Sequence, residues 1–202
     1  MTKPFFRTNR AAYHISPSEP AAATLVGILQ AEPSLSKRLV VIAQLSDQLI
    51  EGPLADQRSI LDLLCAFIRA RTPLVGPRSL HAVPAEDVQA ALNVLAARPR
   101  QQGPNGNEFP LDLRDTDLTG AWLASAHFRL ARFDRASLRM VDLSYAEIEG
   151  ASFRDADLGG ATLAHSRSTG ADFCGARLHN VDLTGTARSE GGEFKEPRAM
   201  AS

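Results

Sequence analysis

Large apolar residues recur at every fifth position in the second half of the chain. The register holds for 75 residues, from Leu111 to Gly185, and fourteen of its fifteen positions are large and apolar. Two positions earlier the residue is nearly always small, most often Ala, and the other three positions are mainly polar or Gly. A helical stripe recurs at about 3.6 residues and a strand at 2, so this period predicts a chain that turns once per repeat.

The repeats resemble the A(D/N)LXX pattern of the pentapeptide-repeat family, as in ADLGG at 156–160, VDLSY at 141–145 and VDLTG at 181–185. The resemblance implies a right-handed quadrilateral β-helix with four pentads in each coil, so fifteen pentads would make about four coils. At about 4.8 Å per layer, such a solenoid is roughly 18 Å long.

Folding the pentads four to a coil sorts the large residues by type. The first face stacks Leu or Phe, the second and third faces stack Leu, and the fourth face reads Phe128, Ile148 and Ser168. We therefore expect a weaker core at the pentad SRSTG, 166–170. The stacked positions of the first three faces are Leu113, Phe133, Phe153, Phe173; Leu118, Leu138, Leu158, Leu178; and Leu123, Leu143, Leu163, Leu183.

Charged residues on the first face alternate in sign from coil to coil. One column reads Arg114, Asp134 and Arg154, and the next reads Asp115, Arg135 and Asp155. Because like charges stacked in neighbouring coils would repel, this alternation predicts a lattice of surface ion pairs that sets the register.

Helical spacing of apolar residues precedes the repeats. We expect a flexible N-terminus at 1–19, a helical region at 20–98, a Pro- and Gly-rich linker at 99–110, the solenoid at 111–185 and a disordered tail at 186–202. The strongest helices are expected at 35–50, 55–70 and 85–97. The segments RSILDLLCAFIRARTP and PAEDVQAALNVLAARP resemble the helical region that precedes the repeats in a group of bacterial pentapeptide-repeat proteins.

Composition narrows the function classes. Twenty-two basic and 23 acidic side chains give a formal charge of -1, which excludes the basic footprint of a general nucleic-acid binder. The first twenty residues lack the apolar stretch of a signal peptide, and the run from Leu39 to Ala43 is too short to span a bilayer. Two widely separated cysteines, Cys65 and Cys174, match no zinc or redox spacing. These features predict a soluble cytoplasmic protein without a membrane span.

The sequence offers no constellation for catalysis. Aspartates such as Asp117 and Asp157 recur because the repeat places them before the large core residue, and the histidines fall on different faces or positions of the coil. We therefore expect no enzyme activity, no catalytic residue, no cofactor and no metal site.

Long apolar or aromatic residues at outward repeat positions are the best candidates for a functional surface. These are Trp122, Tyr145, Leu130 and Met140, of which Trp122 and Tyr145 share the third face in neighbouring coils. Exposed aromatic residues are favoured at protein interfaces. The alternative is that the chain's own helices pack over them.

Two functions remain open from the sequence. The first is an interaction scaffold, with the helical region covering one end of the solenoid and an unidentified protein on a side face. The last coil, with Phe173, Leu178 and Leu183, is then a candidate edge for a homodimer. The second is implied by the resemblance: some family members mimic DNA, bind topoisomerase (gyrase) and protect it. Residues 111–185 carry eleven acidic and eight basic side chains, a weak charge for a DNA mimic.

Overall fold

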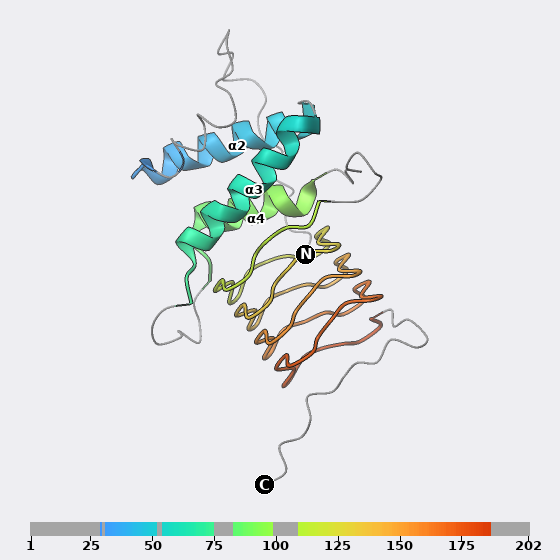
Figure 1. The fold of residues 1–202 in the computed structure, drawn as a ribbon. Helices are drawn as coiled ribbons and strands as arrows, with labels where there is room; N and C mark the ends of the chain where they lie inside the picture. The colour runs from blue at the N-terminus through green and yellow to red at the C-terminus, as the bar shows by residue number, and fades with distance from the viewer. Residues whose placement is uncertain (1–28, 30, 52–53, 75–82, 99–108, 187–202) are drawn as a thin grey trace, which may run out of the picture.

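In the described part of the chain, a layer of helices is stacked on one end of a coiled repeat region (Figure 1). This computed structural model describes residues 29, 31–51, 54–74, 83–98 and 109–186. The helices are α2 (Leu35–Glu51), α3 (Leu54–Arg71) and α4 (Glu86–Ala97), which confirms the three predicted helices to within one residue at each end. The expected flexible N-terminus and nearly all of the expected linker and tail lie outside the described residues.

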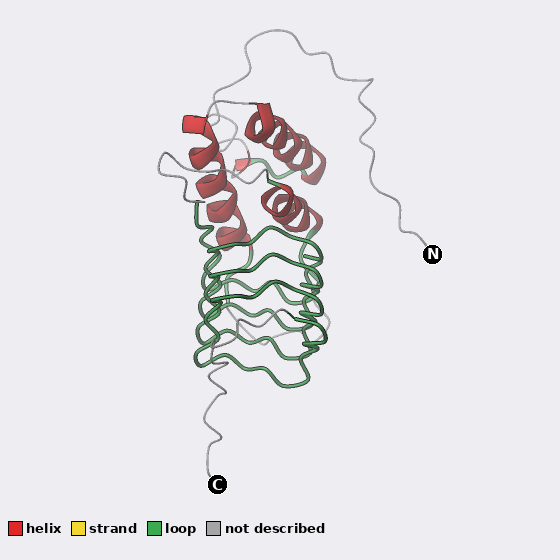
Figure 2. Cartoon of the chain, turned by 90° about the vertical axis from the view of Figure 1, so that its right-hand side faces the viewer, coloured by secondary structure: helices red, strands yellow, loops and turns green. Residues whose placement is uncertain are grey.

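Each coil of the repeat region contains four pentads. Parallel bridges join residues twenty apart, from Asp112↔Arg132 to Thr162↔Asp182. Only isolated bridges occur in the repeats, and Figure 2 shows no extended strand in the described residues. The reason is local, because a turn interrupts the extended backbone in every pentad. The predicted right-handedness stays a prediction.

The turns depend on a left-handed residue at the last position of each pentad. Gly120 has φ 69°, and the Ala121 N–H donates to the Leu118 carbonyl at 3.0 Å, as in a type II turn. Several of these positions hold a residue with a side chain, including Leu130 at φ 57°. A side chain in this conformation costs about 1–2 kcal/mol, so neighbouring coils must hold these corners in place.

Stacked apolar side chains fill the interior of the coils. The rings of Phe133 and Phe153 lie 5.2 Å apart and nearly parallel, and those of Phe153 and Phe173 lie 4.9 Å apart. The pentad 166–170 is the exception that the sequence predicted. Ser166 is fully buried there, and its hydroxyl has no hydrogen-bond partner.

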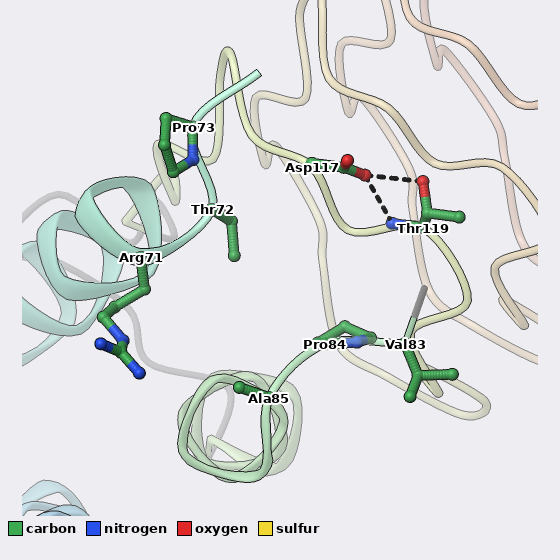
Figure 3. A pocket seen from close by; sticks show the side chains of 8 residues that line it. All are labelled: Arg71, Thr72, Pro73, Val83, Pro84, Ala85, Asp117 and Thr119. Atoms are coloured by element: carbon green, nitrogen blue, oxygen red, sulfur yellow. Dashed lines mark hydrogen bonds between the residues drawn. The ribbon is translucent and has the colours of Figure 1, made fainter. Parts of the chain in front are cut away.

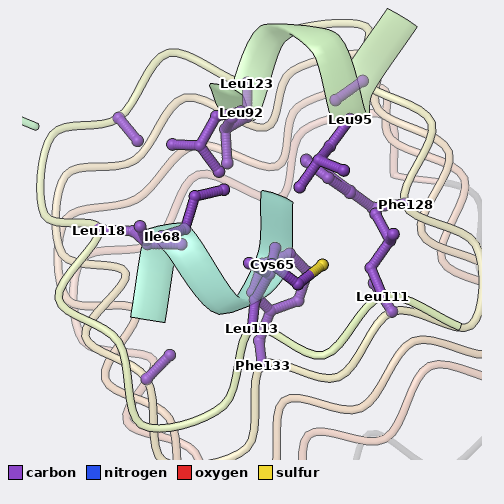
Figure 4. Packing of buried hydrophobic residues seen from close by; sticks show 14 of the residues in the cluster. Cys65, Ile68, Leu92, Leu95, Leu111, Leu113, Leu118, Leu123, Phe128 and Phe133 are labelled. Carbon is purple, nitrogen blue, oxygen red and sulfur yellow. The ribbon is translucent and has the colours of Figure 1, made fainter. Parts of the chain in front are cut away.

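The helices cover the first coil with apolar side chains. Cys65 and Ile68 of α3, with Leu92 and Leu95 of α4, lie over the open end of the coil interior (Figure 4). A buried ion pair ties the helices together, because Asp87 at the start of α4 contacts Arg38 of α2 at 2.7 Å and Arg71 of α3 at 3.2 Å. The residues of the coil interior shown beneath them are Leu111, Leu113, Leu118, Leu123, Phe128 and Phe133.

The same helical layer accepts hydrogen bonds from the backbone of the first coil. In later coils, the second residue of each pentad donates its N–H to the coil before it, as Arg132 does to the Leu111 carbonyl at 2.8 Å. The first coil has no predecessor, so its four equivalent N–H groups use the helical region instead. Asp112 donates to the Cys65 thiol, Asp117 to the Thr72 carbonyl, Trp122 to the Gln89 side chain and His127 to the Ala96 carbonyl. The helices therefore cap the coil with polar groups as well as apolar ones.

Candidate interaction surface

The arginines are distributed unevenly over the four faces of the coil. We number them by the pentads of the first coil: face 1 from 111–115, face 2 from 116–120, face 3 from 121–125 and face 4 from 126–130, each continued at intervals of twenty residues. Faces 1, 2 and 4 hold all eight arginines of the described repeat region, whereas face 3 holds no Arg or Lys. The pentads of face 3 are AWLAS, VDLSY, ATLAH and VDLTG.

The arginines on the other three faces are all paired with carboxylates. Arg135 contacts Asp115 in the preceding coil with two bonds of 2.7 Å, which confirms the predicted alternation at this point and lowers the pKa of Asp115. The remaining pairs are Arg114–Asp112, Arg129–Glu149, Arg132–Asp134, Arg139–Asp157, Arg154–Asp172, Arg167–Glu149 and Arg177–Asp157.

One part of the predicted ion-pair lattice is wrong. Arg114 contacts Asp112 of its own pentad at 2.7 and 2.9 Å, and not Asp134 in the next coil. Residues two apart on an extended segment point to the same side, so this carboxylate is closer than the one in the next coil. The hydrogen bonds from the Arg114 side chain hold the pKa of Asp112 at about 2.

Face 3 combines exposed aromatic residues with small polar ones. Trp122 is 67% exposed and Tyr145 is 61% exposed, so the described helices leave both side chains accessible. Other outward positions of face 3 hold small side chains, among them Ala124, Ser144 and Thr162. Face 3 therefore has the amphipathic anchors typical of a protein interface and few charges to desolvate.

The other exposed apolar residues occupy corners. Met140 lies at the corner where face 3 begins and Tyr145 at the corner where it ends, while Leu130 follows face 4. Each leans toward the same corner of the next coil: Tyr145 stacks on His165 at 5.0 Å, and Leu130 and Met140 lie against Gly150 and Gly160. The structure thus gathers Trp122, Met140 and Tyr145 around face 3 and leaves Leu130 apart from them.

The helical cap extends face 3 beyond the first coil. The side-chain amide of Gln89 on α4 donates to the Trp122 carbonyl at 2.8 Å and accepts the Trp122 N–H at 3.1 Å. Sequence reasoning missed Gln89, since a Gln in the middle of a helix carries no signal for such a role.

The candidate dimer edge lies at the opposite end of the coil. Phe173 is 5% exposed, and Leu178 and Leu183 are half-buried. These side chains belong to the last described coil, as the repeat register predicted.

Outside face 3, the side chains with reactive groups include the two cysteines. Burial raises the pKa of the Cys65 thiol to about 12, and Cys174 is half-buried. No group of three or more His, Cys, Asp or Glu side chains in the described residues could hold a metal ion. None of the described helices is both long and apolar enough to cross a bilayer.

A hollow of about 220 Å³ lies between the helical layer and the start of face 2 (Figure 3). Its two charged side chains are already bonded: Asp117 accepts the Thr119 N–H and hydroxyl at 3.1 and 2.6 Å, and Arg71 pairs with Asp87. Its lining residues are Arg71, Thr72, Pro73, Val83, Pro84, Ala85, Asp117 and Thr119.

Comparison with known proteins finds matches for the repeats. The family model described as pentapeptide repeats matches residues 112–148 and 151–186 in eight copies. A comparison with curated proteins found no match.

Several solved structures resemble the repeat region. HetL, a pentapeptide repeat protein involved in heterocyst differentiation regulation from Nostoc sp. strain PCC 7120, is 32% identical, with a TM-score of 0.39; the match covers 41% of this chain and 38% of HetL. A pentapeptide repeat protein from the Arabidopsis thaliana thylakoid lumen is also 32% identical (TM-score 0.21; 42% of this chain and 58% of that one). QnrB1, a plasmid-mediated fluoroquinolone resistance protein, is 19% identical (TM-score 0.14; 38% and 61%). The chain spans less than two thirds of each of these proteins.

Proposed function

Because residues 112–186 are a domain of the pentapeptide-repeat family, we propose that this chain is a non-enzymatic protein-interaction module that binds its partner through face 3. The observation that carries the proposal is the difference between the faces. On faces 1, 2 and 4 every arginine is already paired, so binding there would disrupt ion pairs or bury them. Face 3 offers exposed aromatic side chains among small residues, with only two carboxylates.

The helical region has a separate role in this proposal. It caps the first coil, which prevents the open coil from pairing with another chain, and it leaves face 3 accessible. A cytoplasmic location, in which both cysteines stay reduced, fits the free thiols of Cys65 and Cys174.

A charge placed on face 3 tests the proposal. Ala124 on face 3 and Thr169 on face 4 are both exposed and occupy the same position of their pentads, so neither Ala124→Arg nor Thr169→Arg should disturb folding. In affinity capture, we expect Ala124→Arg to lose the partners that the native chain binds and Thr169→Arg to retain them. Equal capture by all three chains contradicts the proposal.

We further propose that a second copy of the chain packs against the last coil, where Leu178 and Leu183 are half-buried at the end of the apolar columns. Light scattering on the native chain and on Leu183→Lys tests this step. A dimer that the substitution dissociates, without loss of the folded state, supports it, and a native monomer contradicts it.

Gyrase binding by DNA mimicry is the alternative function, and it needs a uniformly negative surface. The paired arginines on three faces oppose it. A binding assay in which this chain competes with DNA for gyrase would support the alternative function.

A further inference from the structure

One column of face 3 carries an aromatic residue and two carboxylates in a straight line. Parallel bridges join Trp122 to Asp142, Asp142 to Thr162 and Thr162 to Asp182 in successive coils. At about 4.8 Å per coil, Asp142 and Asp182 lie about 10 Å apart along the coil axis. The column therefore presents an aromatic side chain followed by two negative charges at a fixed spacing.

These two carboxylates have no cationic partner among the described arginines and lysines. Asp142 accepts the Ser144 N–H at 3.0 Å, and Asp182 accepts the Thr184 N–H at 2.9 Å. Every arginine of the described repeat region pairs with a carboxylate on face 1, 2 or 4, and none pairs with face 3. A ligand of this column should thus carry two positive charges about 10 Å apart, next to an aromatic residue.

The first fourteen residues of the chain have this chemistry. The segment MTKPFFRTNRAAYH contains Phe5, Phe6, Arg7 and Arg10, and the first acidic residue of the chain is Glu19. In a polyproline II conformation, residues three apart lie on the same side of the chain and about 9 Å apart. Arg7 and Arg10 then match the spacing of the two carboxylates. Phe6 lies one residue before Arg7, at the Trp122 end of the column and a third of a turn away from the side that the two arginines share.

We propose that the segment 1–14 docks intramolecularly along this column, with Phe6 beside Trp122, Arg7 at Asp142 and Arg10 at Asp182. The proposal rests on the proposed function of face 3 and identifies its resident ligand, which a protein partner must displace. Residues 11–28 can span up to about 60 Å when extended, several times the length of the coil stack. A short tether gives an effective concentration in the millimolar range, so weak contacts suffice for docking.

A second segment provides a matched control. Residues 194–198, FKEPR, have the same aromatic and basic spacing, with Lys195 and Arg198 three residues apart. Glu193 and Glu196 cancel these charges, so this segment should bind the acidic column far less well. Charge reversal at Lys195 and Arg198 therefore controls for net charge and for reversal at a chain end.

The experiment uses Trp122, the only tryptophan of the chain, as the reporter. Acrylamide quenching and the emission maximum are measured on the full chain, on Arg7→Glu with Arg10→Glu, and on Lys195→Glu with Arg198→Glu. Circular dichroism melts verify that all chains are folded. Two exposed ion pairs contribute a factor of about two to thirty to the docking equilibrium constant. We expect the first pair of substitutions to remove that factor, so that acrylamide quenching increases and the emission maximum shifts to the red.

Rescue makes the test specific. Adding Asp142→Arg and Asp182→Arg to the Arg7→Glu, Arg10→Glu chain should restore the quenching of the native chain. Unchanged quenching in the Arg7→Glu, Arg10→Glu chain, or an equal effect of the Lys195→Glu, Arg198→Glu control, overturns the proposal. A change that depends on protein concentration also overturns it, because docking would then occur between two copies.

Failure here is distinguishable from failure of the proposed function. If Trp122 quenching is the same in the native chain and in the Arg7→Glu, Arg10→Glu chain, while Ala124→Arg still abolishes partner capture, then face 3 is a binding surface and the segment 1–14 is not its ligand. If the quenching and rescue behave as expected while Ala124→Arg has no effect on capture, the segment docks on face 3 and the partner binds elsewhere.

Discussion

Gln89 takes the place of a missing strand beside Trp122. Its side-chain amide donates to the Trp122 carbonyl at 2.8 Å and accepts the Trp122 N–H at 3.1 Å. Within the coils, a backbone in the neighbouring layer makes these same two bonds, as at Asp142, whose carbonyl accepts the Leu123 N–H and whose N–H donates to the Ala121 carbonyl. A single helical side chain thus satisfies both backbone groups at the end of face 3, directly beneath the proposed binding surface.

Replacing this side chain should weaken the attachment of the cap. Gln89→Ala removes these two hydrogen bonds and a third, which the Gln89 amide donates to Asn93 Oδ1 at 2.9 Å. Each contributes about 0.5–1.5 kcal/mol, so we expect a loss of about 1.5–4.5 kcal/mol in the free energy of unfolding. Gln44→Ala removes an exposed Gln of α2 and serves as the control. Urea denaturation of the three chains measures the difference, and an equal stability of both variants contradicts the role given to Gln89.

The buried ion pair of the helical layer should contribute more to the free energy of unfolding than Gln89 does. Asp87 is fully buried and contacts Arg38 and Arg71, while its other oxygen accepts the Val88 N–H at 3.0 Å. Asp87→Asn leaves the nearly buried Arg38 without its counter-charge, which typically costs about 3–5 kcal/mol.

The control for Asp87→Asn is an Asp–Arg ion pair that is exposed to solvent. Asp62→Asn breaks the exposed contact between Arg58 and Asp62 within α3, which contributes only about 0.2–0.5 kcal/mol. Thermal melts should therefore separate the two variants widely. A small effect of Asp87→Asn would mean that the helices hold together through apolar packing alone.

The coil could be predicted from the sequence because its signal is repeated fifteen times, whereas the cap has no repeated signal. The positions of Phe133, Phe153 and Phe173 follow from the period alone, and their rings stack as expected. The contacts of Gln89 and Cys65 with the first coil depend on how two helices are placed in three dimensions, and helical periodicity shows only which side of a helix is apolar. Arg114 was mispaired for a related reason, because alternating columns do not reveal that Asp112 in the same pentad is nearer.

Two residues at the same repeat position should respond in opposite ways to replacement by Ala. The buried hydroxyl of Ser166 has no partner, so Ser166→Ala should stabilise the fold by about 1 kcal/mol, since an unsatisfied buried group costs about 1–3 kcal/mol. The hydroxyl of Thr116, which is also the first residue of its pentad but lies on face 2 of the first coil, donates to the Leu113 carbonyl at 2.7 Å. Thr116→Ala should therefore destabilise the fold. Denaturant midpoints measure both effects, and the same sign for the two variants contradicts this interpretation.

The reactivity of Cys65 should report whether the cap is closed. Burial of Cys65 where α3 packs on the first coil raises the pKa of this thiol from 9.0 to about 12, so at pH 8 the folded protein holds far less thiolate than the unfolded chain does. In a Cys174→Ser background, we expect a thiol reagent to modify Cys65 only at the rate at which the cap opens, and Gln89→Ala should increase that rate. The sign is fixed by the pKa shift: the neutral thiol is favoured in the fold, so stability falls as the pH rises above about 9. Rapid modification of Cys65 in the native protein at pH 8, as fast as in denaturant, would show that the helices do not close the first coil.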